Sequence, residues 1–373
     1  MQNRISEFLQ SRIDAGDFPS AVYLVAEKGE IVFQDALGDA VLDPERIDAR
    51  LDTIYDLASL TKVTVTGLLM ARLIESKEIT PSDPAARFFP SNLSDAPDRL
   101  KIGDLLVHTS GLPAWEPLYL KVEDPSAILD HIMQVPGKDP GLHVTYSDLN
   151  FQLLGYIAEE IYGQDLSSIF QVHIADALGL KHTAFNPREQ FDTKRIAASE
   201  LGNQYEKQTC VEMGFVAVDE MGSPQSAIRD ELIWGEVHDG NAYFMGGVAG
   251  HAGLFSTAEE VFKIGQQFLA GYTQLLSPET CELFRINFTE GMNEDRSFAF
   301  QLASTEGSTA GLKMSPQSFG HNGFTGTSLW IDPIKERVFV LLTNRTHNHP
   351  LPFENINSVR REFHDLAIRL LDS

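Results

Sequence analysis

Ser59-Leu60-Thr61-Lys62 opens a stretch whose apolar residues recur at helical spacing. On a helix, residues three apart share a face, so the Lys62 amine can reach the Ser59 hydroxyl. A serine hydroxyl attacks a carbonyl efficiently only with a base beside it, and a helix N-terminus favours the negative charge that then develops. The segment predicts a nucleophile at the start of a helix. By itself, the same spacing is more often a solvated helix face.

A second motif, Thr145-Tyr146-Ser147-Asp148, follows Pro140-Gly141 and precedes another set of apolar residues at helical spacing. We expect Tyr146 on a loop that enters this helix. A tyrosine hydroxyl beside a cationic lysine can lose its proton more easily than its ordinary pKa of about 10 suggests, and can then take or return a serine proton. The alternative is an ordinary core tyrosine.

The third motif is His321-Asn322-Gly323-Phe324, within residues 319–333. The glycines in this segment allow the backbone to approach a ligand closely. The segment is typical of an edge strand beside a cleft.

In this order, the three motifs resemble those of the serine β-lactamase-related family, which groups class C β-lactamases, D-Ala-D-Ala carboxypeptidases and related esterases, including those of the family VIII type. The similarity extends to residues 106–113 (LVHTSGLP) and 247–257 (GVAGHAGLFST), and so covers nearly the whole chain. In relatives, the second of these segments is a scaffold turn leading into a helix under the active site.

The resemblance implies a role for each motif residue. Ser59 would be the acylated nucleophile, Lys62 its proton acceptor and Tyr146 the general base and acid, while His321 stands where lactamases usually keep lysine. The backbone N–H groups of Ser59 and Phe324 would form the oxyanion hole. The strand residues Asn322, Gly323 and Phe324 would bind substrate, and neither a cofactor nor a metal is expected.

Two positions depart from the family pattern. Asp148 stands where relatives commonly have an asparagine, and an aspartate cannot donate a hydrogen bond unless protonated. Either Asp148 pairs with Lys62 and holds it charged, or Asn150 supplies the missing amide. His321, with an ordinary pKa of about 6.5, is mostly neutral at pH 7, so recognition of a substrate carboxylate should be weaker or pH-dependent. This argues against an efficient β-lactamase.

Residues 234–243 (WGEVHDGNAY) are similar to a branch of the family associated with cell-wall recycling, which includes amidases that trim peptides from muramic acid. A muropeptide amidase is therefore one interpretation, with Glu236, His238, Asp239 and Asn241 as candidate cleft residues. An ordinary polar loop is given equal weight.

The hydrophobic patterns predict an α/β (α+β) fold with an antiparallel sheet flanked by helices. Residues 21–25 with 31–36, and 328–331 with 338–343, indicate two hairpins, and an amphipathic helix follows at the C-terminus. Residues 1–65 and 245–373 would form the hydrolase domain of β-lactamase and penicillin-binding-protein type. A mostly helical lobe, residues 66–244, would be inserted between them.

The chain has 373 residues and a net charge of −24, from 53 acidic and 29 basic residues. This charge repels nucleic acid and anionic membranes, and no membrane-length apolar run is present. Cys210 and Cys281 provide no disulfide framework or metal-binding spacing, although a single bridge between them stays open. The N-terminus lacks an uncharged signal core, which predicts a cytoplasmic protein if Met1 is the native start. A signal removed beforehand would instead mean a periplasmic or extracellular protein.

We therefore expect a serine hydrolase that acts through an acyl-enzyme on a small-molecule or cell-wall peptide substrate. Esterase, D-Ala-D-Ala peptidase and muropeptide amidase activities are all open, with weak or no β-lactamase activity. The alternative is a penicillin-binding or sensor protein that is acylated without efficient turnover. The sequence leaves the acyl donor and the oligomeric state undetermined.

Overall fold

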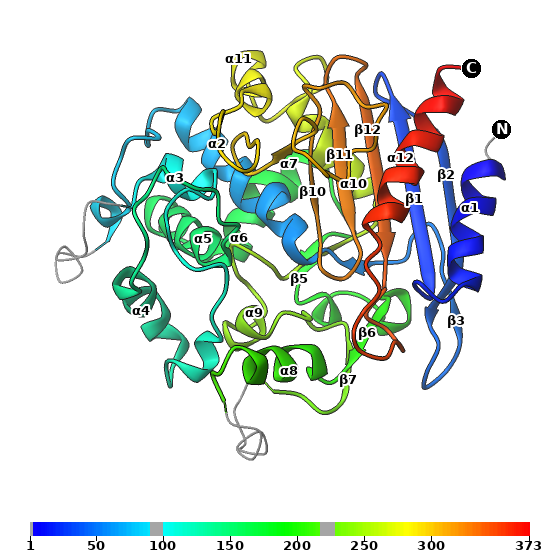
Figure 1. The fold of residues 1–373 in the computed structure, drawn as a ribbon, viewed down its shortest axis with the longest axis horizontal. Coiled ribbons are helices and arrows are strands. Elements are labelled where there is room, and N and C mark those ends of the chain that lie inside the picture. The colour runs from blue at the N-terminus through cyan, green and yellow to red at the C-terminus, as the bar shows by residue number, and fades with distance from the viewer. Residues whose placement is uncertain (1–2, 90–99, 217–227) are drawn as a thin grey trace.

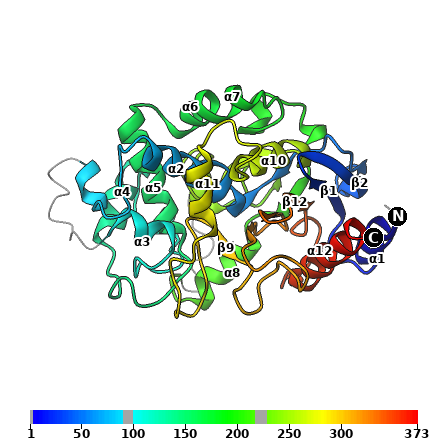
Figure 2. The ribbon, with the colours of Figure 1, turned by 90° about the horizontal axis from the view of Figure 1, so that it is seen from above.

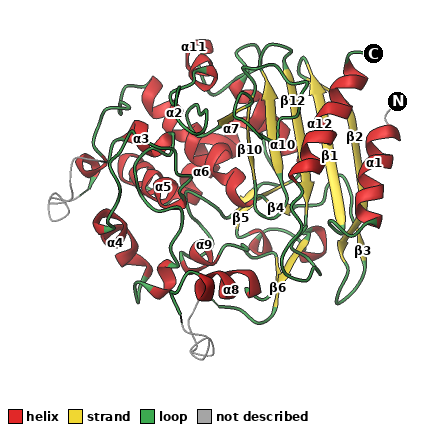
Figure 3. Ribbon diagram, in the orientation of Figure 1, coloured by secondary structure: helices red, strands yellow, loops and turns green. Residues whose placement is uncertain are grey.

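A computed structural model describes residues 3–89, 100–216 and 228–373. Its largest element is a seven-stranded antiparallel sheet on one side of the molecule (Figures 1 and 3). In spatial order, the strands are β3 (Ile47–Asp48), β2 (Glu30–Val41), β1 (Ser20–Glu27), β12 (Arg337–Thr343), β11 (Ser328–Asp332), β10 (Phe319–Asn322) and β9 (Gln301–Leu302). The N- and C-terminal parts thus form one sheet, as predicted.

The alternation of side chains along β1 explains how the sheet is covered. Val22 and Leu24 face the main core with α10 (Ala258–Gly265), whereas Tyr23 and Val25 face a second core under α1 (Asn3–Asp14) and α12 (Asn357–Leu371). Seen from above, α10 and α12 lie on opposite sides of the sheet (Figure 2). One correction concerns β10, because β9 lies outside it and is the edge strand.

The remaining helices gather on the other side of the molecule, where few strands are found (Figure 3). They are α2 (Gly67–Glu75), α3 (Ile102–Leu106), α4 (Ile128–Gln134), α5 (Asp148–Tyr162), α6 (Leu166–Phe170), α7 (Asp176–Leu178), α8 (Gln204–Glu212), α9 (Gly240–Phe244) and α11 (Pro278–Glu282). Two small sheets join β4 (Tyr55–Asp56), β8 (Leu254–Ser256) and β5 (Ala184–Phe185), and β6 (Ala198–Leu201) with β7 (Leu232–Trp234). The main core continues from the large sheet into α2 and α5, and the division into two domains stays a prediction.

Two expectations about composition can be compared with the described residues. Cys210 and Cys281 are both buried and both free, so they form no bridge. None of the helices in the described ranges combines the length and the apolarity that crossing a membrane requires.

Candidate active site

The predicted nucleophile lies at a sharp turn between β4 and the helical segment that follows. Asp56 accepts a hydrogen bond from the Ala58 amide at 2.8 Å, and Ala58 has a left-handed φ of 46°. Ser59 then falls in a 3₁₀ turn, Ala58–Leu60, which continues into a π-helical turn, Lys62–Thr66, and α2. Amides in the first turn of a helix have no intrahelical acceptor, so the Ser59 N–H is suited to an external oxygen.

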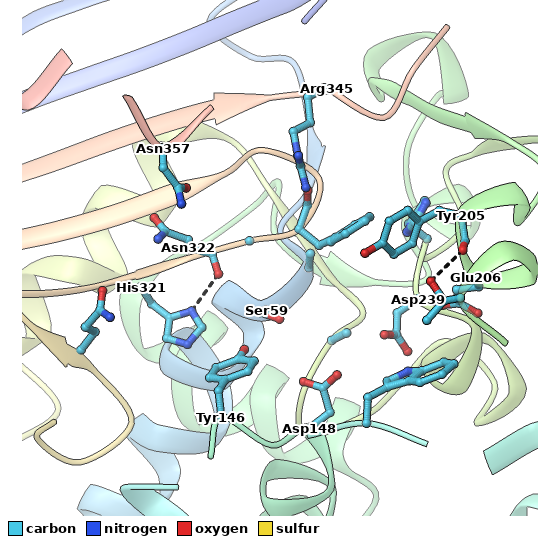
Figure 4. Close-up of a pocket in the computed structure, with 18 of the residues that line it drawn as sticks. Ser59, Tyr146, Asp148, Tyr205, Glu206, Asp239, His321, Asn322, Arg345 and Asn357 are labelled. Atoms are coloured by element: carbon cyan, nitrogen blue, oxygen red, sulfur yellow. Dashed lines mark hydrogen bonds between the residues drawn. The ribbon is translucent and has the colours of Figure 1, made fainter. Parts of the chain in front are cut away.

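Ser59 is half-buried on the wall of a pocket of about 530 Å³. In Figure 4 it lies between Tyr146 and His321 on one side and Asp148, Asp239 and Glu206 on the other. The pocket thus brings together residues from the beginning, middle and end of the chain.

Lys62 lies directly behind Ser59 and is fully buried. Its Nζ donates to Ser59 Oγ at 3.0 Å and to the His251 carbonyl at 3.1 Å, and it forms an ion pair with Asp148 Oδ1 at 2.7 Å. Burial alone would lower the pKa of this amine, but the negative charge of Asp148 and the Tyr146 hydroxyl outweigh burial and raise it. Of the two sequence alternatives for Asp148, the structure has the one in which it pairs with Lys62.

Tyr146 reaches the pocket from the loop before α5, as predicted. The loop is held by His108, whose carbonyl accepts from the Thr145 amide and whose Nδ1 accepts from the Ser147 amide, both at 2.9 Å. The Tyr146 hydroxyl interacts with both Lys62 and Ser59. The expectation of an easily lost proton is wrong for the resting site. Burial raises the pKa of Tyr146, the Lys62 charge lowers it and the Asp148 charge raises it, with a net increase.

The turn between β10 and β11 is tied to the segment just before Ser59. Thr325 Oγ1 donates to the Asp56 carbonyl at 2.7 Å, and Thr327 Oγ1 donates to the Leu57 carbonyl at 3.0 Å. These bonds hold Gly323 and Phe324 against the nucleophile turn. A Cβ on Gly323 would come within 2.0 Å of Thr327 Oγ1, which explains the glycine.

His321 lies on β10 and is 5% exposed, at the pocket wall. Its Nδ1 lies 2.9 Å from the Asn322 carbonyl, so Nδ1 carries the proton and Nε2 is an acceptor. Burial, followed by the charges of Arg296 and Lys62, lowers the pKa of His321 well below 6.5. The expected pH-dependent recognition of a carboxylate by this histidine is therefore not supported near neutral pH, because the ring stays neutral.

Asn150 is a correction to the predicted set. It is fully buried and does not line the pocket. Its amide donates to the Leu105 carbonyl at 3.2 Å and accepts from Ser110 Oγ at 2.6 Å. Residues two apart on a helix point in different directions, so Asp148 and Asn150 cannot both face the same cleft from the first turn of α5.

Of the four candidate residues in the 234–243 segment, His238 and Asp239 line the pocket. Glu236 lies elsewhere, paired with the exposed Arg188 at 2.7 Å, and Asn241 is buried and bonded to the backbone of residues 116 and 118. The 247–257 segment does more than support a helix, because its His251 carbonyl contacts Lys62 and its ring pairs with Asp239 at 3.0 Å.

Asp148, Asp239 and His251 have potential metal-ligand atoms within 4.8 Å of one another. The two carboxylates already have partners, since Asp148 pairs with Lys62 and Asp239 with His251. Each carboxylate therefore already has a partner among the described residues.

The pocket also contains residues that the sequence analysis missed. They include Trp115, Tyr205, Glu206, Arg296, Gln301, Arg345 and Arg360. Burial, followed by the nearby Asp239 charge, raises the pKa of Glu206 to about 7. Arg345 lies over the ring of Phe324 at 4.9 Å, and its Nε donates to the Phe324 carbonyl at 2.7 Å. No local motif marks these residues, because they come from separate segments.

Comparison with known proteins assigns the chain to a family. A model described as Beta-lactamase matches residues 3–361. The chain belongs to the beta-lactamase family. It is a serine hydrolase of this family, as the order of its motifs predicted.

Among relatives of this beta-lactamase-family chain is an Escherichia coli (strain K12) protein named "Putative D-alanyl-D-alanine carboxypeptidase". It is 33% identical over 375 residues, covering 93% of this chain and 82% of the relative. A Salmonella agona protein of the same name is 34% identical over 379 residues, covering 93% and 83%.

Solved structures with the same fold include an octameric penicillin-binding protein homologue from Pyrococcus abyssi (TM-score 0.72, 17% identity, 99% of this chain and 77% of that one). Another is EstCE1, described as a hydrolase with promiscuous acyltransferase activity (TM-score 0.71, 21% identity, 97% of each chain). At these identities, the similarity to solved structures shows only that this beta-lactamase-family chain shares their fold. The predicted roles of its residues rest on the geometry described above.

Proposed function

We propose that this protein hydrolyses an amide or ester through an acyl-enzyme on Ser59. The observation that carries the proposal is the buried contact of Lys62 with both Ser59 and Asp148, beside the Tyr146 hydroxyl. Because Lys62 is held protonated, we assign the first proton transfer to Tyr146, which acts in its phenolate form after losing its own proton to solvent and which the Lys62 charge then stabilises.

In the first step, the bond from Ser59 Oγ to the carbonyl carbon forms as the serine proton moves to the phenolate of Tyr146. The bond to the leaving nitrogen or oxygen breaks, and the leaving atom takes the proton back from Tyr146. Water then attacks the ester bond of the acyl-enzyme, with Tyr146 taking a proton from the water and passing it to Ser59 as the acyl group leaves. The amides of Ser59 and Phe324 would stabilise the oxyanion in both steps.

For the acyl donor, we propose a D-Ala-D-Ala-type or muramyl peptide ahead of a simple ester. The relatives named as carboxypeptidases support this order, as do the polar side chains of His238, Asp239 and Glu206 in the pocket.

We propose weak or no β-lactamase activity for a kinetic reason. A β-lactam keeps its opened ring tethered to the acyl-enzyme, so release depends on activating water beside the retained product. Water activation is already weak in this site at neutral pH, because Lys62 is protonated and Tyr146 is neutral, so we expect the retained ring to slow release more than in an acyl-enzyme whose leaving group has departed.

The same observation favours a second candidate function. If Asp148 holds Lys62 charged throughout, Ser59 would be acylated once and the acyl group would be released only slowly. This behaviour is expected of a penicillin-binding or sensor protein. This alternative predicts labelling without turnover.

The experiment is intact-mass spectrometry of wild type and Ser59→Ala after exposure to a β-lactam, an activated short-chain ester and a muramyl peptide, with product release followed in parallel. A Ser59-dependent adduct with turnover supports the hydrolase. A stable adduct without turnover supports the sensor. Absence of both adduct and product with all three compounds would overturn the assignment of Ser59.

A further inference from the structure

The segment of residues 106–113 (LVHTSGLP), which the proposed mechanism does not use, runs beside the loop that enters α5. The Gly141 amide donates to the Thr109 carbonyl at 2.8 Å. Further along the same loop, Ser147 Oγ donates to the Pro113 carbonyl at 2.7 Å. The two segments are therefore joined at several points, and one residue of the first segment makes the contacts nearest to the reacting groups.

That residue is His108, which binds the backbone on both sides of Tyr146. Its carbonyl accepts from the Thr145 amide and its Nδ1 accepts from the Ser147 amide, both at 2.9 Å. The φ of His108 is 61°, in the left-handed region that few residues other than glycine adopt. In this conformation, the carbonyl and the ring of one residue both reach the loop. The peptide groups before and after Tyr146 are thereby held in place.

The His108 ring also packs against the phenol ring that its hydrogen bonds help to place. It is fully buried, and its centroid lies 4.6 Å from that of Tyr146 and 5.2 Å from that of Phe151 on α5. The Tyr146 ring is also contacted by His321, at 5.6 Å between centroids. The phenol therefore has little room to move, and its hydroxyl interacts with Ser59.

The hydrogen bond from the Ser147 amide requires a neutral His108 ring. Since Nδ1 is the acceptor, the ring proton is on Nε2. Burial, followed by the charges of Arg296 and Lys62, lowers the pKa of His108 well below 6.5, so the acceptor is retained at neutral pH. Nε2 is buried and has no hydrogen-bond partner among the described residues. A phenyl ring would avoid this cost but would leave the Ser147 amide without its acceptor.

We propose that His108 is a positioning residue that holds the phenol of Tyr146 within reach of Ser59 through its carbonyl and its neutral ring. This inference rests on the proposed role of Tyr146 in proton transfer. Ser147 lies between Tyr146 and Asp148, so a shift of its peptide group would displace the phenol and the carboxylate together. A displacement of about 1 Å in a reacting group can lower a rate about a hundredfold.

The test compares two substitutions of His108 that remove different contacts. His108→Phe keeps a ring but removes the acceptor, whereas His108→Asn removes the ring, keeps an acceptor atom on Cγ and tolerates a left-handed φ. With 4-nitrophenyl acetate as substrate, we expect His108→Phe to lower kcat about tenfold to a hundredfold with little change in KM. His108→Asn should recover part of this loss. His364→Phe is the matched control and should leave kcat unchanged, because His364 is also fully buried but lies on α12 outside the pocket.

A double-mutant cycle shows whether His108 acts through Tyr146. Once Tyr146→Phe has removed the hydroxyl, adding His108→Phe should lower kcat no further. Additive losses, a loss confined to KM, or equal losses in His108→Phe and His364→Phe would overturn the positioning role while the hydrolase stands. If Tyr146→Phe keeps full activity, or if no ester is cleaved through Ser59, the proposed function itself fails.

A measurement on wild type covers variants that do not fold. The ¹⁵N chemical shifts of histidine-labelled protein should show His108 as a neutral ring with its proton on Nε2 between pH 6 and 8. Its signals can be recognised by nuclear Overhauser contacts with the neighbouring Tyr146 ring. A proton on Nδ1 of His108 would exclude the hydrogen bond from the Ser147 amide and overturn the proposal.

Discussion

The Lys62 ammonium and the Asp148 carboxylate lie 2.7 Å apart, with the lysine side chain fully buried behind Ser59. This pair determines the resting charge of the site, because Asp148 raises the pKa of both Lys62 and Tyr146. A catalytic proton acceptor must be free of its proton before it can act. Activity should therefore depend on pH through these two groups.

We predict that Asp148→Asn moves the activity profile to lower pH. Since the pKa values of Lys62 and Tyr146 are both raised, wild-type kcat/KM should rise with pH above neutrality. Removing the carboxylate lowers both pKa values, so the rising limb shifts down and the rate at pH 7 increases by about tenfold. The measurement is kcat/KM for an activated ester between pH 6 and 10.

Asp130→Asn, at an exposed position on α4, is the control and should leave the profile in place. If the rising limb of the pH–rate profile is the same in Asp148→Asn as in wild type, neither Lys62 nor Tyr146 limits the rate. Because Lys62 would lose its buried counter-charge, the melting temperature of the variant should also fall by several degrees.

We predict that His321 stays neutral throughout the pH range of activity. Its pKa is lowered well below 6.5 by burial and by Arg296 and Lys62, so the ring gains a proton only in acid. The ¹⁵N chemical shifts of histidine-labelled protein, assigned by comparison with His321→Gln, should show a neutral ring with a protonated Nδ1 between pH 6 and 8. A ring that titrates near pH 6.5 would contradict the burial argument.

Thr327 should matter more to catalysis than to substrate binding. Its hydroxyl donates to the Leu57 carbonyl and so holds the Gly323–Phe324 turn against Ser59. We expect Thr327→Val to lower kcat by about tenfold or more with little change in KM, because displaced oxyanion donors affect the transition state most. Thr343→Val is a matched control, since Thr343 is equally buried and its hydroxyl has no partner in the described part of the chain. If Thr327→Val and Thr343→Val lower kcat equally, the hydrogen bond from Thr327 to Leu57 has no specific role in catalysis.

The sequence predicts the large sheet, and the proximity of Ser59 and Lys62, because both follow local rules. Alternating residues in β1 and β12 and the spacing of Ser59 and Lys62 can be read from short windows. The error at Asn150 arose from treating residues two apart as interchangeable on a helix. Arg296, which lines the pocket, was missed because no local motif marks it and its place there depends on the packing of distant segments. The pKa of Tyr146 was misjudged because burial, which no short motif reveals, outweighs the nearby lysine.

Gly320 provides a test of how tightly β10 must pack to present His321. An added Cβ would come within 2.1 Å of the Trp330 ring on β11, which is fully buried in the core under α12. Since Trp330 cannot move outwards, we expect Gly320→Ala to cost about 1–3 kcal/mol of the free energy of unfolding and to reduce activity by shifting the strand. Gly271→Ala is the control, because its added Cβ would meet only a side-chain oxygen of Glu336 at 3.7 Å. Urea unfolding of both variants, alongside kcat/KM, checks the prediction. If Gly320→Ala leaves the free energy of unfolding unchanged, β10 can shift away from Trp330. If that variant also keeps full activity, the position of His321 is not critical to the reaction.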